Sequence, residues 1–298
     1  MRVSTVTDVL AKTYGDAEAL RRLAEIGYDA VDFSLFNYPQ DQGLLTAPLE
    51  QFRAYFQRLR AVADQAGIAV GQVHAPMAAF PDTPEKREKY HDLALRGIEA
   101  AGALGSPYVV VHPLIWPGCV YDRGHAENKE MNLDFYSRLM PALRRCRVQL
   151  GIENMFAWDA ERQSICPTVV SSAEEMADYI DTLNGLADEE LFVACLDIGH
   201  ATLTGLAPPE EMLRVLGSRT RLLHVQDTDG VSDLHTAPYF GGAVNWDAVC
   251  GALCAQRYSG TLSFEADGFL MRVPPSLYMD AERMLHAIGR RLADKVTG

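Results

Sequence analysis

The segments that decide the fold are Ala194-Cys-Leu-Asp-Ile-Gly-His200 and Leu222-Leu-His-Val-Gln-Asp227. Each begins as a short apolar run of the kind found in a buried strand, and each ends in acidic and imidazole side chains. Carboxylate and imidazole groups gathered at strand ends are suitable ligands for a divalent metal. The rest of the chain repeats this pattern, so the two segments indicate both the fold and the place of the site.

Outward from these segments, strand signals recur along the whole chain. The strands are short and almost continuously apolar, which is typical of parallel sheets buried on both faces. The expected strands are Arg2–Thr7, Ala30–Leu35, Ile68–Val73, Tyr108–Val111, Val148–Ile152, Phe192–Leu196, Arg221–His224 and Gly260–Phe264.

A helical segment follows each expected strand, and capping residues mark several of its ends. The expected helices are 16–26, Leu49–Ala66, Pro84–Leu104, Met131–Cys146, one beginning at Ser172, Pro208–Leu216, Asn245–Gln256 and Pro275–Ala293. Eight such strand–helix units in a chain of 298 residues predict an α/β fold, a single (β/α)8 TIM barrel. Because no linker or low-complexity tract divides the chain, we expect one domain over residues 1–298.

Composition restricts the class of protein. The formal net charge of −13 argues against nucleic-acid binding, which depends on neutralising phosphates with Lys and Arg. The six cysteines form no CxxC pair, and the first residues lack the apolar core of a secretory signal. No apolar run approaches the length of a membrane span. We therefore expect a soluble, cytoplasmic protein with reduced thiols.

Polar side chains stand at corresponding places where six of the expected strands end. In a barrel of this kind, the active site lies at the carboxyl ends of the strands. Three converging carboxylates without a cation would repel one another, so a divalent metal held by Glu153, Asp197, His224 and Glu265 is the simplest explanation. The strand-end residues are His74, His112, Glu153, Asp197, His224 and Glu265, and close to them in sequence lie His200, Asp233 and His235.

Structural interpretations of single residues stay open. His74 or His112 taken alone is more often a structural histidine than a ligand, and Asp233 and His235 could simply shape a loop. The aromatic residues Trp116, Phe156 and Trp158 fit the walls of a pocket and ordinary loop packing equally well. The pair Gly241-Gly242 is weak evidence for a phosphate-binding loop, because no helix signal follows at the required distance.

The chain resembles the xylose-isomerase-like barrels over nearly its whole length. That superfamily includes tagatose 3-epimerase-type sugar epimerases, inosose dehydratases and endonuclease IV. The segment Asp227–Trp246 is most similar to bacterial proteins described as sugar phosphate isomerase/epimerases. The motifs that carry the resemblance are Val73-His-Ala-Pro76, Ile152-Glu-Asn154, Leu196-Asp-Ile-Gly-His200, His224-Val-Gln-Asp227 and Phe264-Glu265.

The resemblance to the ketose epimerases implies a role for each strand-end residue. Glu153, Asp197, His224 and Glu265 would hold one divalent ion (Mn, Mg, Co or Zn), and Glu153 and Glu265 would also be the catalytic acid/base pair. The substrate would be a small sugar, a ketose or a related carbonyl compound derived from a polyol. The expected substrate-binding residues are His74, His112, His200, Trp116, Asp233 and His235. Barrels of this family commonly pair, which makes a homodimer possible.

Two other members of the superfamily supply the alternatives. An inosose-type dehydratase would use the same metal site for a lyase reaction. Endonuclease IV holds three zinc ions with nine residues whose order this chain can match: His74, His112, Glu153, Asp197, His200, His224, Asp233, His235 and Glu265. Against a nuclease stand the net charge and the loop Ala75–Pro84, which contains no basic residue.

Overall fold

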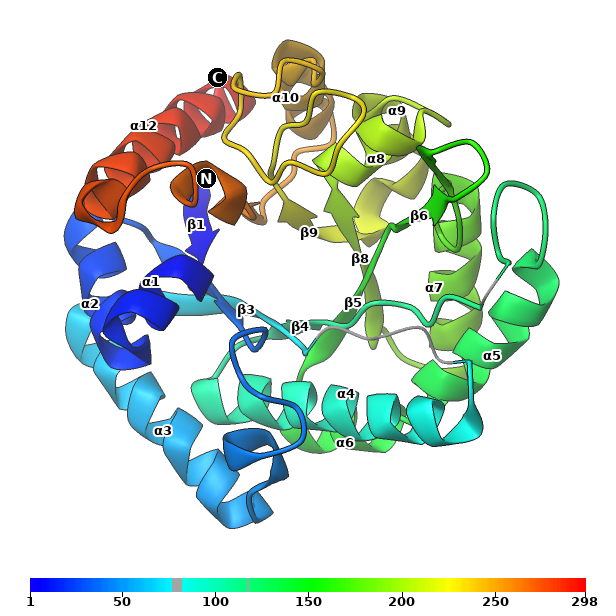
Figure 1. The fold of residues 1–298 in the computed structure, drawn as a ribbon, viewed down its shortest axis with the longest axis horizontal. Coiled ribbons are helices and arrows are strands. Elements are labelled where there is room, and N and C mark those ends of the chain that lie inside the picture. The colour runs from blue at the N-terminus through cyan, green and yellow to red at the C-terminus, as the bar shows by residue number, and fades with distance from the viewer. Residues whose placement is uncertain (77–81, 117) are drawn as a thin grey trace.

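A computed structural model describes residues 1–76, 82–116 and 118–298. Eight parallel strands form one sheet in the order β10-β1-β2-β3-β4-β5-β8-β9 (Figure 1), which confirms the expected TIM barrel. The eight strands are β1 (Arg2–Val6), β2 (Ala30–Ser34), β3 (Ala69–His74), β4 (Tyr108–Val110), β5 (Gln149–Glu153), β8 (Phe192–Asp197), β9 (Thr220–His224) and β10 (Thr261–Phe264).

The two ends of this sheet meet just beyond β9 and β10. The amide of Val225 donates to the carbonyl of Ser263 at 2.7 Å, and the amide of Glu265 donates to the carbonyl of Val225 at 3.3 Å. A parallel bridge between Val225 and Phe264 completes the junction. The sheet therefore closes into a barrel, and the carboxyl ends of all eight strands surround one opening.

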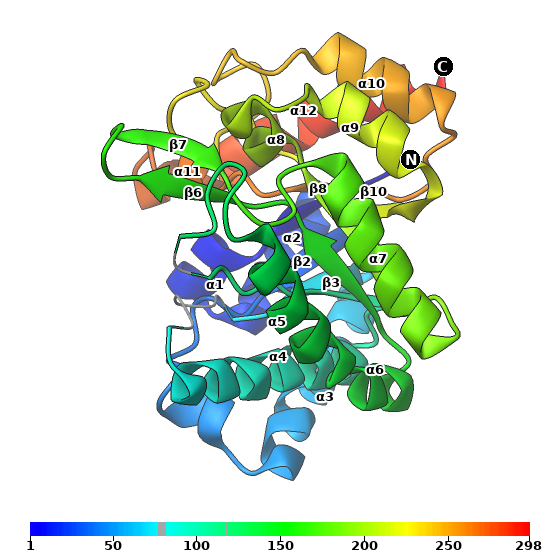
Figure 2. The same ribbon diagram turned by 90° about the vertical axis from the view of Figure 1, so that its right-hand side faces the viewer.

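Helices form the outer layer, as Figure 1 shows along the barrel and Figure 2 shows from the side. The α-helices that follow the strands in turn are α2 (Asp16–Ile26), α3 (Leu49–Ala66), α4 (Pro84–Leu104), α5 (His125–Ser137), α6 (Met140–Cys146), α7 (Ala173–Ala187), α9 (Pro209–Leu216), α10 (Trp246–Ala255) and α12 (Tyr278–Thr297). Three short 3₁₀ turns, η1 (Gly43–Thr46), η2 (Gly217–Arg219) and η3 (Pro275–Leu277), connect them to neighbouring elements.

The helix expected over Met131–Cys146 is two helices, α5 and α6. Pro141 lies in the first turn of α6, where its missing amide costs no hydrogen bond. The same missing amide prevents a continuous helix, because no donor at position 141 could reach the carbonyl of Ser137. The expectation of one helix here was wrong.

Sequence reasoning also missed an antiparallel hairpin and three short helices. The hairpin pairs β6 (Phe156–Asp159) with β7 (Ser164–Pro167), and it projects at the same end of the barrel as the short helix α11 (Asp267–Leu270) (Figure 2). The other two helices, α1 (Asp8–Tyr14) and α8 (Ile198–Thr204), begin directly after β1 and β8. All of these elements lie in the segments that follow strands, where periodicity in the sequence is too short to be recognised.

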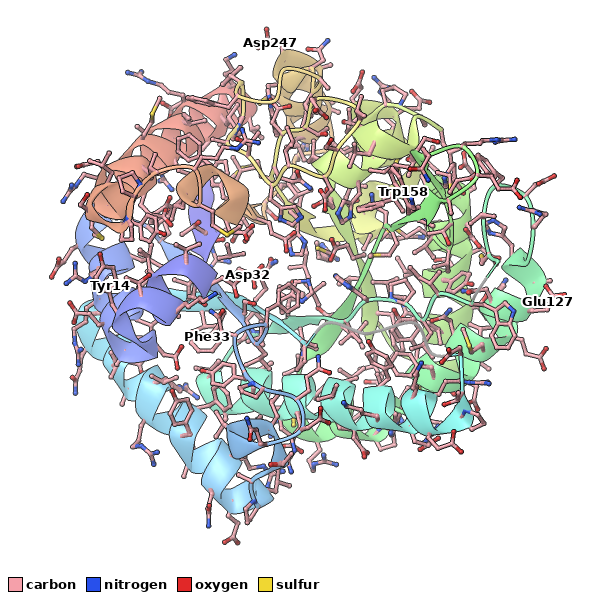
Figure 3. All side chains as sticks on the ribbon, viewed as in Figure 1. Tyr14, Asp32, Phe33, Glu127, Trp158 and Asp247 are labelled. Atoms are coloured by element: carbon pink, nitrogen blue, oxygen red, sulfur yellow. The ribbon has the colours of Figure 1, made fainter. Side chains whose placement is uncertain are left out.

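Successive side chains of β2 point alternately toward the surrounding helices and into the barrel. Phe33 points outward and packs edge-on against Phe56 of α3, with ring centroids 5.8 Å apart. Asp32, the preceding residue, is fully buried and lies at the inner side of the ring of strands (Figure 3). The apolar core thus lies between strands and helices, while the interior of the barrel contains polar groups.

Three further observations bear on the expectations from sequence. All six cysteines are unpaired. Within residues 1–76, 82–116 and 118–298, no helix combines the length and the apolar character needed to cross a bilayer. The loop Ala75–Pro84, whose lack of basic residues argues against nucleic-acid binding, lies partly outside the described residues.

Glu282 on α12 provides a test of the packing between that helix and the barrel. Its carboxyl is 1% exposed and accepts a hydrogen bond of 2.8 Å from the hydroxyl of Tyr28. Burial raises the pKa of Glu282 to about 8. Because the folded protein binds this proton more tightly than the unfolded chain does, Glu282 favours folding below about pH 4 and increasingly opposes it as the pH rises to 8.

We therefore expect Glu282→Gln to raise the free energy of unfolding at pH 8 by on the order of 2 kcal/mol, and to change it little at pH 5. Urea unfolding of both proteins at the two pH values measures this difference. An equal effect of the substitution at both pH values would contradict the assigned burial.

Candidate metal centre

Four side chains from four elements meet at the carboxyl end of the barrel. The ligand atoms of Glu153, Asp197, His224 and Glu265 all lie within 4.8 Å of one another. The Nδ1 atom of His224 lies 3.1 Å from Oε1 of Glu153 and 3.0 Å from Oε2 of Glu265. All four residues are buried, with exposed fractions between 0% and 6%.

Strand register brings these residues together. Asp197, the last residue of β8, pairs with His224, the last residue of β9. Glu153 ends β5 and pairs with Cys195, and Glu265 follows β10 directly. The expected strand ends are thus confirmed to within a residue, because a short apolar strand ends where its first charged side chain must find a polar partner.

Two polar atoms at the centre of this group lack a hydrogen-bond partner among the described residues. Oε1 of Glu153 and Nδ1 of His224 find no well-directed hydrogen bond among the described residues, although both are buried. A buried polar atom without a hydrogen-bond partner is costly, and two of them 3.1 Å apart indicate a missing ligand. Carboxylate oxygens and an imidazole nitrogen at this spacing fit a divalent cation.

Electrostatics in the cluster depends on the balance between burial and opposite charge. Burial opposes ionisation of Glu153 and Glu265, but His224 outweighs it, holding the pKa of Glu153 well below its ordinary value and that of Glu265 at about 2. Burial and the neighbouring Glu153 raise the pKa of Asp197 to about 6, against the opposing charge of His200. Protonated imidazoles therefore supply the positive charge that a bound cation would otherwise provide.

His74 and His112 adjoin the cluster through the other oxygen of Glu153. Oε2 of Glu153 lies 3.1 Å from Nε2 of His112 and 3.4 Å from Nε2 of His74. The Nδ1 atom of His74 donates to the carbonyl of Ala75 at 3.0 Å, which leaves Nε2 free to act as an acceptor or a ligand. The structure thus places both histidines beside the four-residue group.

A third group consists of His200, Asp233 and His235, whose ligand atoms also lie within 4.8 Å of one another. Oδ2 of Asp233 lies 3.0 Å from Nε2 of His235 and 3.8 Å from Nε2 of His200. Burial would lower the pKa of His200 and of His235, but the surrounding carboxylates raise them to about 10 and about 12. Asp233 and His235, in the loop after β9, thus lie together with His200 of α8.

The aromatic residues singled out from the sequence lie in different places. The ring of Phe156 packs against His200, with centroids 4.9 Å apart, so it borders the cluster. Trp158 is 56% exposed on the hairpin (Figure 3). Trp116 stacks under the guanidinium of Arg87 and lines a hollow of about 550 Å³ between α4 and α5, to which none of the cluster residues contributes.

Sequence reasoning missed four polar residues that support the site. The side-chain amide of Asn154 pairs with the backbone of Asp197, and the backbone carbonyl of Asn154 accepts from Nδ1 of His200. The amide of Gln226 donates to Asp233 at 3.0 Å and lies 3.4 Å from both oxygens of Asp197. Inside the barrel, Gln72 donates to Asp32 at 2.7 Å. Asp32 is a charge within a mostly apolar strand, and Asn154 and Gln226 lie within the quoted motifs Ile152-Glu-Asn154 and His224-Val-Gln-Asp227.

Comparison with known proteins assigns the family. Residues 20–285 match the family described as xylose isomerase-like TIM barrel, and the chain belongs to that family. A curated relative is y4fM of Sinorhizobium fredii (strain NBRC 101917 / NGR234), an uncharacterized protein. It is 26% identical over 266 residues, which cover 80% of this chain and 78% of the relative.

Solved structures share the fold. A D-tagatose 3-epimerase-like protein is 20% identical and superposes with a TM-score of 0.71, with all of both chains covered. A D-psicose 3-epimerase, crystallised in the presence of D-fructose, is 12% identical with a TM-score of 0.72 and the same complete coverage. Because the sequence identity is low, these comparisons show that the chain shares the barrel fold of those proteins.

Gly199 on α8 tests how tightly the supporting amides are packed. A Cβ at this position would lie 2.4–2.6 Å from the amide group of Gln226, which is fully buried and cannot move aside freely. We expect Gly199→Ala to lower the free energy of unfolding by about 1–3 kcal/mol and to reduce the rise in melting temperature caused by Mn²⁺. Thermal and urea unfolding with and without Mn²⁺ measure both effects.

Gly185→Ala in α7 is the matched control, because open space surrounds that position. It should leave the Mn²⁺ effect unchanged and add up to about 1 kcal/mol of stability. Equal behaviour of the two variants would show that the contact with Gln226 is unimportant.

Proposed function

We propose that this protein is a metal-dependent sugar isomerase or epimerase. The observation that carries the proposal is the position of the Nδ1 atom of His224, 3.1 Å from Glu153 and 3.0 Å from Glu265, with Asp197 completing the group. Two carboxylates are thereby held close to the same buried nitrogen at the opening of the barrel. This arrangement suits the removal of a proton from a carbon beside a carbonyl group and its return.

Glu153 and Glu265 are proposed as the acid/base pair. A divalent cation bound by Glu153, Asp197, His224 and Glu265 would polarise the substrate carbonyl and acidify the neighbouring C–H bond. One carboxylate then takes the proton from carbon. Return of a proton to the opposite face of that carbon by the second carboxylate gives epimerisation, whereas return to the adjacent carbon gives isomerisation. Each placed proton transfer is worth roughly 10²–10⁴-fold in rate.

His74, His112 and His200 are proposed to bind substrate oxygens around this pair. Phe36, whose ring lies 4.5 Å from that of His74, and Phe156, beside His200, give the opening two apolar walls. Such walls exclude water and pack against the C–H faces of a sugar. Trp116 was predicted to contact substrate, but its place under Arg87 gives the proposal no support.

Membership of the xylose isomerase-like family and the fold shared with sugar epimerases agree with this proposal. The scarcity of basic residues in the loops at this end of the barrel is also consistent with a small uncharged substrate. The segments 35–48, 75–83, 198–208 and 225–245, which follow β2, β3, β8 and β9, contain no lysine or arginine. An extended phosphate backbone would find few cations to neutralise it there. A cyclitol dehydratase would use the same residues and remains the related alternative within this proposal.

A three-metal phosphodiesterase is the second candidate, because one observation favours it. Besides the four-residue group, His74 with His112 and Glu153 forms one further cluster of ligand atoms, and His200 with Asp233 and His235 forms another. Three adjacent cation sites could orient a phosphodiester and activate a water molecule. Incision of an abasic site in duplex DNA in the presence of Zn²⁺ would support this second candidate over the first.

Glu265→Gln tests the role given to that carboxylate. The substitution preserves size but removes the base, so we expect at least a 10²-fold loss of turnover with the fold intact. The measurement is incorporation of solvent deuterium into a panel of ketoses, keto-glycosides and inososes, with circular dichroism to verify folding. A variant that exchanges deuterium at the wild-type rate would refute the role of Glu265. Arg283→Gln, at an exposed site on α12, is a suitable neutral control.

A further inference from the structure

Asp32 is a carboxylate with no access to solvent, located inside the barrel. Its Oδ2 atom accepts a hydrogen bond of 2.7 Å from Nε2 of Gln72, and the same atom lies 3.3 Å from Nε2 of His224. Its Oδ1 atom has no hydrogen-bond partner in the part of the chain that the structure describes. Asp32 is neither one of the four proposed metal ligands nor one of the proposed substrate-binding residues.

The two nitrogens of His224 face different groups. Nδ1 lies 3.1 Å from Glu153 and 3.0 Å from Glu265, whereas Nε2, across the ring, lies 3.3 Å from Asp32 without a well-directed hydrogen bond among the described residues. The ring of His74 stacks on the same imidazole at 5.3 Å and 22°, which restricts its tilt. The position of His224 is thus determined by a stacked neighbour and by one carboxylate behind it.

A buried carboxylate is costly unless another group makes use of its charge. Gln72 supplies one hydrogen bond to Oδ2, which leaves the unpartnered Oδ1 atom and the proximity of His224 unexplained. An imidazole that ligates a metal through one nitrogen commonly gives its other N–H to a carboxylate, which fixes the tautomer and increases the basicity of the ligating nitrogen. Asp32 stands where such a carboxylate is needed.

We propose that Asp32 is a positioning residue for the metal centre, acting through His224. It holds the proton of that imidazole on Nε2 and leaves the lone pair of Nδ1 directed at the cation, while Gln72 fixes the orientation of the carboxylate. The inference rests on the proposed function only in assuming that the four-residue group binds a divalent ion. It concerns Asp32 and Gln72, which support the proposed ligand His224, and it does not depend on which sugar is the substrate.

The test is the dissociation constant for Mn²⁺, measured by isothermal titration on metal-free protein. We expect Asp32→Leu to weaken Mn²⁺ binding by about 10–100-fold. Asp32→Asn keeps an oxygen that can accept from both Gln72 and His224, so it should lose less affinity than Asp32→Leu does. Should Asp32→Leu fail to fold, Asp32→Asn and Gln72→Leu give the same comparison, each with a smaller expected loss.

A merely structural role would produce a different pattern. It predicts that the variants lower the melting temperature of the metal-free protein but bind Mn²⁺ with wild-type affinity once folded. The matched control is Glu282→Gln, which alters another buried carboxylate remote from the site and should leave Mn²⁺ affinity unchanged.

A double-variant comparison tests whether Asp32 acts through His224. In a His224→Ala background, Asp32→Leu should cause no further loss of Mn²⁺ affinity. A loss as large as in the wild-type background would overturn the proposal. Equal Mn²⁺ affinity of the wild-type protein and of Asp32→Leu would overturn this proposal alone. Wild-type protein that binds no divalent ion would overturn the proposed function as well.

Discussion

The structure depends on one electrostatic constraint, the burial of three carboxylates and an imidazole within 4.8 Å at the opening of a barrel. Negative charges at this separation, shielded from water, cannot all remain ionised without a positive partner. In the protein alone, His224 and His200 supply that partner, which explains why the pKa of Glu265 falls while that of His200 rises. A divalent cation would replace these protons and satisfy the orphaned atoms of Glu153 and His224 in one step.

Much of the surrounding architecture maintains this arrangement. Parallel register sets Asp197 beside His224. The side chain of Asp197 also accepts from the amide of His200 and so caps the N-terminus of the short helix α8. The amide of Gln226 then joins Asp197 to Asp233, so the four-residue group and the His200 group are mechanically linked. Displacement of Asp197 or Asp233 would therefore shift side chains in both groups.

The sequence was sufficient to predict the strands and the residues at their ends. Short apolar runs ending in charge, as in β8 and β9, indicate both strand and site because the same burial that forms the strand forbids an unpartnered charge. The supporting residues were not predictable in this way. The side chain of Asn154 pairs with the backbone of Asp197, and the side chain of Gln226 contacts the carboxylates of Asp197 and Asp233, partners that no local sequence pattern specifies. The hairpin β6–β7 has no signal stronger than that of a loop. The break between α5 and α6 could have been inferred from Pro141, which a helical pattern of apolar residues concealed.

The most direct test of this account is the number of divalent ions bound per chain, determined by elemental analysis after dialysis of the purified protein against a low concentration of Mn²⁺, Co²⁺ or Zn²⁺. We expect one tightly bound ion per chain in the wild type and none in an Asp197→Asn/Glu265→Gln double variant that remains folded. Three zinc ions per chain would instead favour the phosphodiesterase. A folded wild-type protein that takes up no ion from any of these solutions would contradict the central claim.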